Sequence, residues 1–226
     1  MRLAILLLAG LAAMSLVACG GDDEAPPAPL PLAQRFVAAE DAPGSKPDPV
    51  ETRRTTEDFD EFIQVLSDMA IDPDRDAMIA LFEEAGFKGA GADARFFGET
   101  HPPDFGEPVP HVFSSEIELG SEEGATSALD WLQEDRMKPC PMSCAVQRSE
   151  FDVDDVSGAR GVHRSASSED IREMGTGDEE PFDEYWVGFT VGSVVYTMSL
   201  HGPPGSVTEE QALEIATAYH DRLTGN

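Results

Sequence analysis

The chain has 226 residues, of which 44 are Asp or Glu and only 15 are Lys or Arg, so its formal net charge is −29. A surface this acidic repels nucleic-acid phosphates and anionic lipid headgroups, because contacts to phosphate need Lys and Arg. The composition therefore excludes a nucleic-acid-binding protein. High net charge favours solubility, and recruitment of cations or of a basic partner is the alternative use of such a charge.

The first 18 residues have the parts of an export signal. Met1-Arg2 gives a positive start, residues 3–17 form an almost unbroken apolar run, and Cys19 follows Ala18. The run is too short to span a bilayer comfortably as a helix and fits a signal peptide. Residues 16–19, Leu-Val-Ala-Cys, resemble the lipobox of bacterial lipoproteins, in which the signal is cut before the cysteine and that cysteine is acylated. The resemblance implies lipidation of Cys19 and a lipid-anchored location on the extracytoplasmic face of the cell membrane.

Residues 19–55 are predicted to form a disordered, lipidated tether. The stretch 20–54 holds seven of the 17 prolines, and Phe36 is its only aromatic residue. Such a composition is typical of chains that do not fold. A flexible chain of this length reaches about 30–35 Å, which would hold the domain clear of the membrane. After removal of residues 1–18, which contain Arg2 and no acid, the mature chain would carry a net charge of −30.

Residues 56–226 are long enough for one compact domain with its own core. Apolar residues recur at helical spacing between residues 59 and 70, and Thr55 with Asp58 offers a start signal for this first helix. A second helix is predicted to begin at Asp72, with Pro73 in its first turn, and to stop at Gly86.

The second helix overlaps the one metal-like pattern in the chain. Asp72, Asp74, Asp76 and Glu83 fall at positions 1, 3, 5 and 12 of a loop spaced like the calcium loop of EF-hand proteins. Position 6 is Ala77, however, where the sharp turn of that loop needs glycine. Helix capping and favourable charges near a helix N-terminus account for the same acids. We therefore expect no metal site and no cofactor.

The remaining elements predict an α+β fold. Strands are expected over residues 87–97, 111–119, 145–153 and 159–165, a helix from Ser121 to the Lys138-Pro139 pair, and a loop or a single helical turn over 167–180. Residues 185–191 and 194–200 are rich in β-forming residues and flank Gly192-Ser193, which predicts a tight hairpin. A last helix should begin after Ser206 or Thr208. Helices and a hairpin without regular βαβ alternation favour a single domain with helices packed on an antiparallel sheet, an α/β sandwich.

Two cysteines remain once Cys19 is lipidated. Cys140 and Cys144 are separated by three residues, and exported proteins usually pair such cysteines. A redox centre normally has two intervening residues, and a metal site would need further ligands that the sequence does not offer. We therefore predict a structural disulfide between Cys140 and Cys144.

No catalytic motif is present. The five histidines, at positions 101, 111, 163, 201 and 220, are scattered and lack the spacing of zinc ligands. The sequence has no nucleophile elbow, phosphate-binding loop or zinc-protease helix. Trp131 and Trp186 lie on predicted elements and are expected in the core.

Two function classes remain open. The favoured one is a membrane-anchored, non-catalytic domain that binds a protein, a cell-wall component or a small molecule. The alternative is a cell-surface hydrolase whose catalytic groups converge from distant positions. The layout of the folded part is similar to small lipoproteins of high-GC Gram-positive bacteria, a resemblance that implies an α/β sandwich and assigns no functional residue.

Overall fold

The computed structural model describes residue 30 and residues 34–48, 54–69, 74–98, 109–139, 146–168 and 181–226. In chain order the elements are β1 (Ser45–Pro47), β2 (Arg54–Thr56), α1 (Phe59–Met69), α2 (Arg75–Glu84), β3 (Gly89–Phe97), β4 (His111–Glu118), α3 (Glu122–Met137), β5 (Gln147–Phe151), β6 (Arg160–Ala166), β7 (Phe182–Val191), β8 (Val194–Gly202) and α5 (Glu209–Thr224). No helix in these ranges is both long and apolar enough to cross a membrane.

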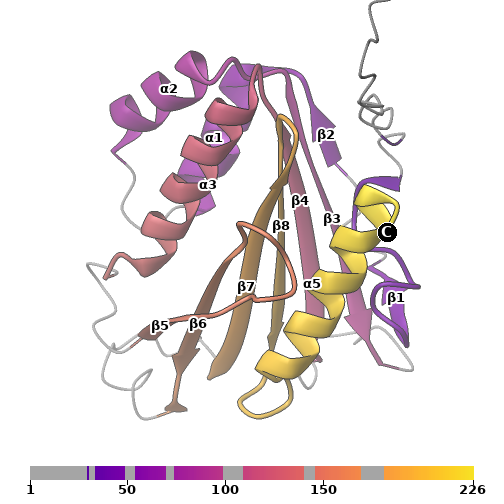
Figure 1. The fold of residues 1–226 in the computed structure, drawn as a ribbon. Coiled ribbons are helices and arrows are strands. Elements are labelled where there is room, and N and C mark those ends of the chain that lie inside the picture. The colour runs from indigo at the N-terminus through magenta and orange to yellow at the C-terminus, as the bar shows by residue number, and fades with distance from the viewer. Residues whose placement is uncertain are drawn as a thin grey trace, which may run out of the picture.

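One antiparallel sheet organises the domain. Its strands follow the order β1-β3-β4-β8-β7-β6-β5, and β2 pairs with β3 beside β1. The predicted hairpin forms β7 and β8, and Gly192 at its turn has a φ of 58°, a left-handed conformation that glycine adopts without strain. The predicted α+β class, a single antiparallel sheet carrying helices, is confirmed (Figure 1).

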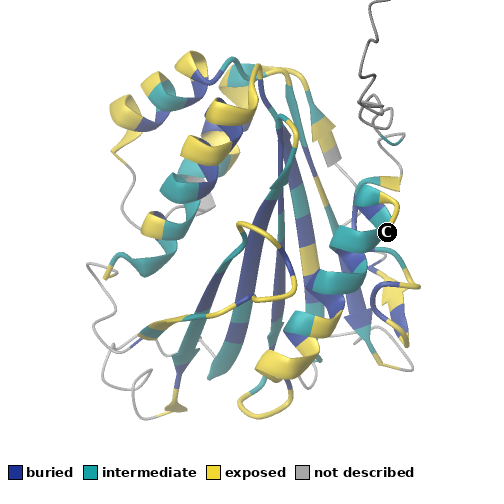
Figure 2. Ribbon diagram, in the orientation of Figure 1, coloured by how far each residue is buried: buried dark blue, intermediate teal, exposed yellow. Residues whose placement is uncertain are grey.

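Helices pack on both faces of the sheet. Neighbouring residues of a strand point to opposite faces, so Trp186 belongs to a core formed with α1, α2 and α3, whereas Val187 belongs to a core formed with α5. We call these the α3-side core and the α5-side core. The helices bury the residues that face the sheet and expose those on their outer sides (Figure 2).

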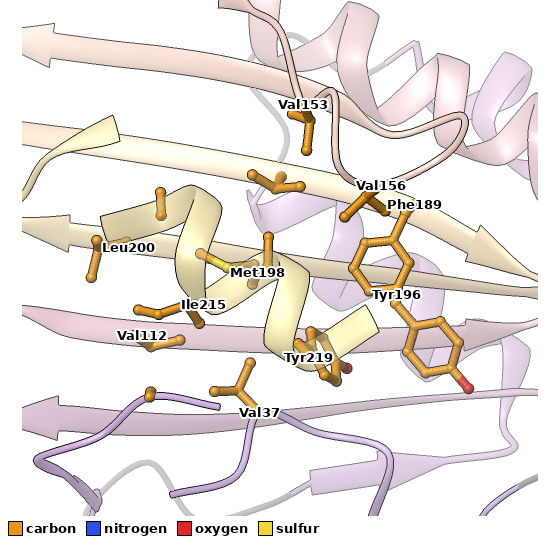
Figure 3. Packing of buried hydrophobic residues seen from close by; sticks show 14 of the residues in the cluster. Val37, Val112, Val153, Val156, Phe189, Tyr196, Met198, Leu200, Ile215 and Tyr219 are labelled. Carbon is orange, nitrogen blue, oxygen red and sulfur yellow. The ribbon is translucent and has the colours of Figure 1, made fainter. Parts of the chain in front are cut away.

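Local sequence signals set both ends of α5. The Thr208 side chain accepts a hydrogen bond from the Gln211 backbone, and the Gln211 side chain accepts one from the Thr208 backbone, so the two form a capping box. At the other end Gly225 has a φ of 76°, which ends the helix. Between them, Ile215 and Tyr219 pack among Val112, Phe189, Tyr196 and Met198 of the sheet (Figure 3).

The folded region begins earlier than the sequence predicted. The expected tether, residues 19–55, contains β1 and part of β2, and both strands pair with β3. Phe36 and Val37 are each 2% exposed, and Val37 lies in the α5-side core. Composition missed this segment because its few apolar residues sit among prolines, and the partners that bury them lie far along the chain.

Arg222 on α5 binds residues 34–48, which we call the N-terminal segment. Its guanidinium donates to both carboxylate oxygens of Asp41 at 2.6–3.0 Å and to two backbone carbonyl oxygens of the same segment. The Tyr219 hydroxyl donates to the Arg35 carbonyl. Residues near the end of α5 therefore fix the part of the chain that leads back to Cys19.

Two predicted helix starts also differ. Asp58 accepts a hydrogen bond from Glu61 N at the start of α1, whereas Thr55 lies in β2. Asp74, and not Asp72, caps α2 by accepting from Ala77 N. Several acids in each stretch can serve as caps, and sequence alone did not choose among them. The predicted stop before Gly86, which has a φ of 71°, is confirmed.

Candidate functional site

Several of the sequence-predicted site residues lie outside the described part of the chain. These are Cys19, Cys140, Cys144 and Asp72. Of the calcium-loop acids that are described, Asp74 caps α2, Asp76 lies in its first turn and Glu83 is exposed on its surface. Within the described ranges, no group of three or more His, Cys, Asp or Glu side chains is arranged to hold a metal ion.

Three histidines lie close to aspartates in the described part of the chain, but none of them is paired with a nucleophile. His111 Nε2 lies 3.6 Å from Asp48, and His163 Nε2 lies 3.5 Å from Asp183. His220 Nδ1 lies 3.5 Å from Asp221. Among the described residues, no histidine is hydrogen-bonded to a serine, threonine or tyrosine hydroxyl.

The sheet register brings ionisable residues into one line on the α3 side. His111 pairs with His201, His201 with Glu184, and Glu184 with Arg164, so these four side chains follow one another across β4, β8, β7 and β6. We call them the cross-sheet row. Arg136 reaches the same carboxylate from α3.

Glu184 is the centre of this row. Burial would raise its pKa, but the charges of Arg136 and Arg164 and a hydrogen bond from Ser199 hold the pKa below its usual value. Arg164 Nη1 donates to one carboxylate oxygen at 2.9 Å, and Ser199 Oγ donates to the other at 2.9 Å. The carboxylate is therefore fully paired and joins the C-terminal end of α3 to the sheet.

This arrangement does not activate Ser199 as a nucleophile. The base that accepts its proton would be Glu184, and a carboxylate with a lowered pKa is a poor general base near neutral pH. Burial also lowers the pKa of His201, although the nearby Glu184 carboxylate opposes that shift. The cross-sheet row thus fits a structural ion-pair network.

The opposite face carries an open groove beside α5. The groove has a volume of about 800 Å³ and runs between α5 and the loop 152–159 that joins β5 to β6. In Figure 1 this loop crosses the sheet toward α5. Val153 and Val156 anchor the loop in the α5-side core (Figure 3). Leu213 contributes apolar surface to the groove, which is lined by five carboxylates: Asp155, Glu209, Glu210, Glu214 and Asp221.

An aromatic cluster lies on the same side of the sheet as α5. The rings of His163 and Tyr185 stack with centroids 4.4 Å apart, and Phe151 meets Tyr185 edge-on at 6.0 Å. Gly161 permits this packing, because a Cβ at that position would lie 2.6 Å from the backbone oxygen of Phe151. Partial burial and the charges of Asp183 and Glu209 raise the pKa of Tyr185, so its phenol is neutral at physiological pH.

The spacing of polar residues in α5 indicates one wall of this groove, but the prediction of that helix did not use it. Glu210, Glu214, Thr217 and Asp221 are spaced by four, three and four residues, so they form one stripe along α5. The prediction followed only the apolar stripe of the same helix. Asp155 on the opposite wall could not be assigned to the groove from sequence, because its place depends on the tertiary path of the loop.

The comparisons with known proteins concern the fold. No family model and no curated protein sequence matches the chain. Among solved structures, the chain is similar to the extracellular domain of PknH from Mycobacterium tuberculosis. The two are 10% identical, with a TM-score of 0.51, and the alignment covers 88% of this chain and 99% of that one. The likeness shows a shared α+β fold.

Proposed function

We propose that this protein is a lipid-anchored, extracytoplasmic binding domain without catalytic activity, and that the groove beside α5 is its recognition surface. The groove is the observation that carries the proposal, because it is open and is lined by two separate parts of the chain, α5 and the loop that joins β5 to β6. The lipobox-like residues 16–19 support the anchored location. The extracellular origin of a domain with the same fold agrees with it.

The described residues favour binding over hydrolysis. A hydrolase of the serine type needs a nucleophile within hydrogen-bond reach of a base that can take its proton. Ser199 is only 7% exposed and donates to a carboxylate that two arginines already neutralise. The groove instead presents carboxylates and the apolar side chain of Leu213, which can bind a ligand without any bond being broken.

The anchored domain would sit close to the membrane. Ten residues separate Cys19 from Leu30, which packs against the α5-side core. A chain of that length spans at most about 40 Å when fully extended. The N-terminal segment is held by α5, so the reach of the tether is set by the residues before Leu30 and not by the whole stretch to residue 55.

Anchoring and recognition can be tested separately on the full chain in a bacterial host. Mass spectrometry of the membrane-associated protein should find diacylglycerol on Cys19, and Cys19→Ser should move the protein out of the membrane fraction. A soluble wild-type product with a free Cys19 thiol would refute the anchor. Two or more acyl chains are needed for stable anchoring, so the two fractions should separate cleanly.

Recognition can be tested with a photo-crosslinking residue placed in the groove at Thr217 on α5. The matched control carries the same residue at Thr126, which is exposed on α3 on the opposite face of the sheet. A discrete adduct that forms from position 217 and not from position 126 supports the groove as the recognition surface. Equal labelling from both positions, or turnover of ester, peptide or glycoside substrates by the purified protein, would overturn the proposal.

A further inference from the structure

The geometry points to a lysine- or arginine-bearing peptide segment of a protein partner as the occupant of the groove beside α5. This inference rests on the proposed function and names the chemistry of its ligand. It is drawn from the shape of the groove and from the placement of charge and apolar surface along it.

The groove is complementary to a positively charged chain. Its lining includes five carboxylates and no lysine or arginine. The nearby arginine on α5, Arg222, is engaged with Asp41, and Arg160, which follows the loop, pairs with Asp130 at 3.0 Å. Carboxylates held on both walls of a concave surface focus the negative potential into it, which attracts cations and disfavours anionic ligands.

Folding does not account for all of these carboxylates. Glu209 and Glu210 lie in the first turn of α5, where negative charge interacts well with the helix dipole. Glu214, however, lies four residues after Glu210, a spacing at which like charges repel. Asp221 lies near the C-terminal end of α5, where negative charge is unfavourable. The placement of Glu214 and Asp221 is therefore unfavourable for the helix itself, which a ligand-binding role explains.

The apolar part of the groove adds a surface for the methylene groups of a long basic side chain. Leu213 lies among the carboxylates that line the groove. Lysine and arginine side chains bury their methylene groups on apolar surface while their charged ends stay with polar groups. A lysine or arginine side chain in the groove could therefore place its methylene groups against Leu213 and its charge beside the carboxylates of α5.

The length of the stripe sets the length of the ligand. Glu210 and Asp221 are eleven residues apart, and a rise of about 1.5 Å per residue separates them by about 16 Å along α5. An extended peptide covers this distance with about five residues, of which alternate side chains face the same way. A segment of five or six residues with two or three basic side chains on one face therefore fits the groove.

The experiment uses the mature chain with Cys19→Ser and a fluorescein-labelled hexalysine peptide, titrated by anisotropy in 150 mM NaCl. The groove variant combines Glu210→Gln, Glu214→Gln and Asp221→Asn. The control variant combines Asp60→Asn, Glu83→Gln and Glu84→Gln, which removes the same charge from exposed positions on α1 and α2. We expect saturable binding, a loss of at least tenfold in affinity for the groove variant, and less than a threefold loss for the control.

Thermal melting checks that each variant folds. The groove variant loses both the repulsion between Glu210 and Glu214 and the favourable first-turn charge of Glu210, so its melting temperature should stay close to that of the wild type.

Three results would overturn the inference. Absence of saturable binding would refute a basic peptide as the ligand. Equal losses of hexalysine affinity in the groove and control variants would show that binding depends on the net charge of the protein and not on the groove. Displacement of hexalysine by spermine at equal charge concentration would assign the groove to small polyamines instead. The crosslinks from Thr217 test the groove itself, so a failure of the peptide inference is distinguishable from a failure of the proposed function.

Discussion

Replacing Arg222 with alanine should release the N-terminal segment from α5. The Arg222 guanidinium supplies the contacts to Asp41 and to two backbone carbonyls of that segment, and it lies 5.5 Å from the centre of the Tyr219 ring. The Asp41 side chain is only 2% exposed. After the substitution its carboxylate would keep a hydrogen bond from Ala38 N, but its positive partner would be gone.

The magnitude follows from this burial. Removing one partner of a buried ion pair costs about 3–5 kcal/mol, because the remaining charge stays buried without compensation. Asp130 and Arg160 form a matched pair at the surface, with side chains 49% and 35% exposed. An exposed pair contributes about 0.2–1 kcal/mol. Arg222→Ala should therefore cost several times more stability than Arg160→Ala, although each removes one arginine from an Arg–Asp pair.

Urea unfolding measures both costs, and hydrogen exchange locates the change. Amides of residues 34–48 in the Arg222→Ala protein should exchange faster than those of the β7–β8 hairpin. In the Arg160→Ala protein the N-terminal segment should keep its protection. If Arg222→Ala costs no more than Arg160→Ala, or leaves residues 34–48 fully protected, the segment is not held by this ion pair and the revised start of the domain is wrong.

Three further predictions concern the buried carboxylate, the cysteines and calcium. Glu184→Gln should cost about 3–5 kcal/mol in urea unfolding, since Arg136 and Arg164 lose their shared anion. Because the folded-state pKa of Glu184 is lowered, its stabilisation is present above the unfolded-state value near 4.5 and is lost as the pH falls through the folded-state pKa. The wild type should therefore lose stability more steeply on acidification than Glu184→Gln, and parallel pH profiles would contradict this. Thiol trapping of the unfolded, non-reduced mature protein should find no free thiol at Cys140 or Cys144, whereas two labelled cysteines would disprove the disulfide. Calcium should raise the melting temperature no more than magnesium does, and a calcium-selective, saturable rise abolished by Asp72→Ala or Glu83→Gln would restore the metal hypothesis.

Elements with strong local signals could be predicted from the sequence. Ser121 caps α3, as predicted, and Thr208, one of the two predicted candidates, caps α5, because in each case a side-chain acceptor directly precedes a helical apolar pattern. The β7–β8 hairpin followed from two β-rich runs around Gly192. In these cases the deciding interactions join residues a few positions apart.

Features set by distant partners could not be predicted in this way. The order of the sheet places β8 between β4 and β7, and this order aligns His111, His201, Glu184 and Arg164 although they are spread along the chain. The folded N-terminal segment depends on Arg222 near the other end of the sequence. Neither the strand order nor the contact made by Arg222 leaves a local sequence pattern, because both join residues that come together only when the sheet assembles.

The end of α5 connects the two proposals physically. Asp221 lines the groove, and the next residue, Arg222, holds the N-terminal segment, while Tyr219 one turn earlier binds the same segment through its hydroxyl. On the proposed function, a partner bound in the groove would contact the last turns of α5. The same turns bind the N-terminal segment, which leads to the proposed lipid anchor. A flexible attachment at residue 55 would leave the groove free to turn away from the membrane. The ion pair to Asp41 instead fixes where the N-terminal segment lies on the domain, so the placement of the groove relative to the point where the proposed tether begins becomes a property of the fold.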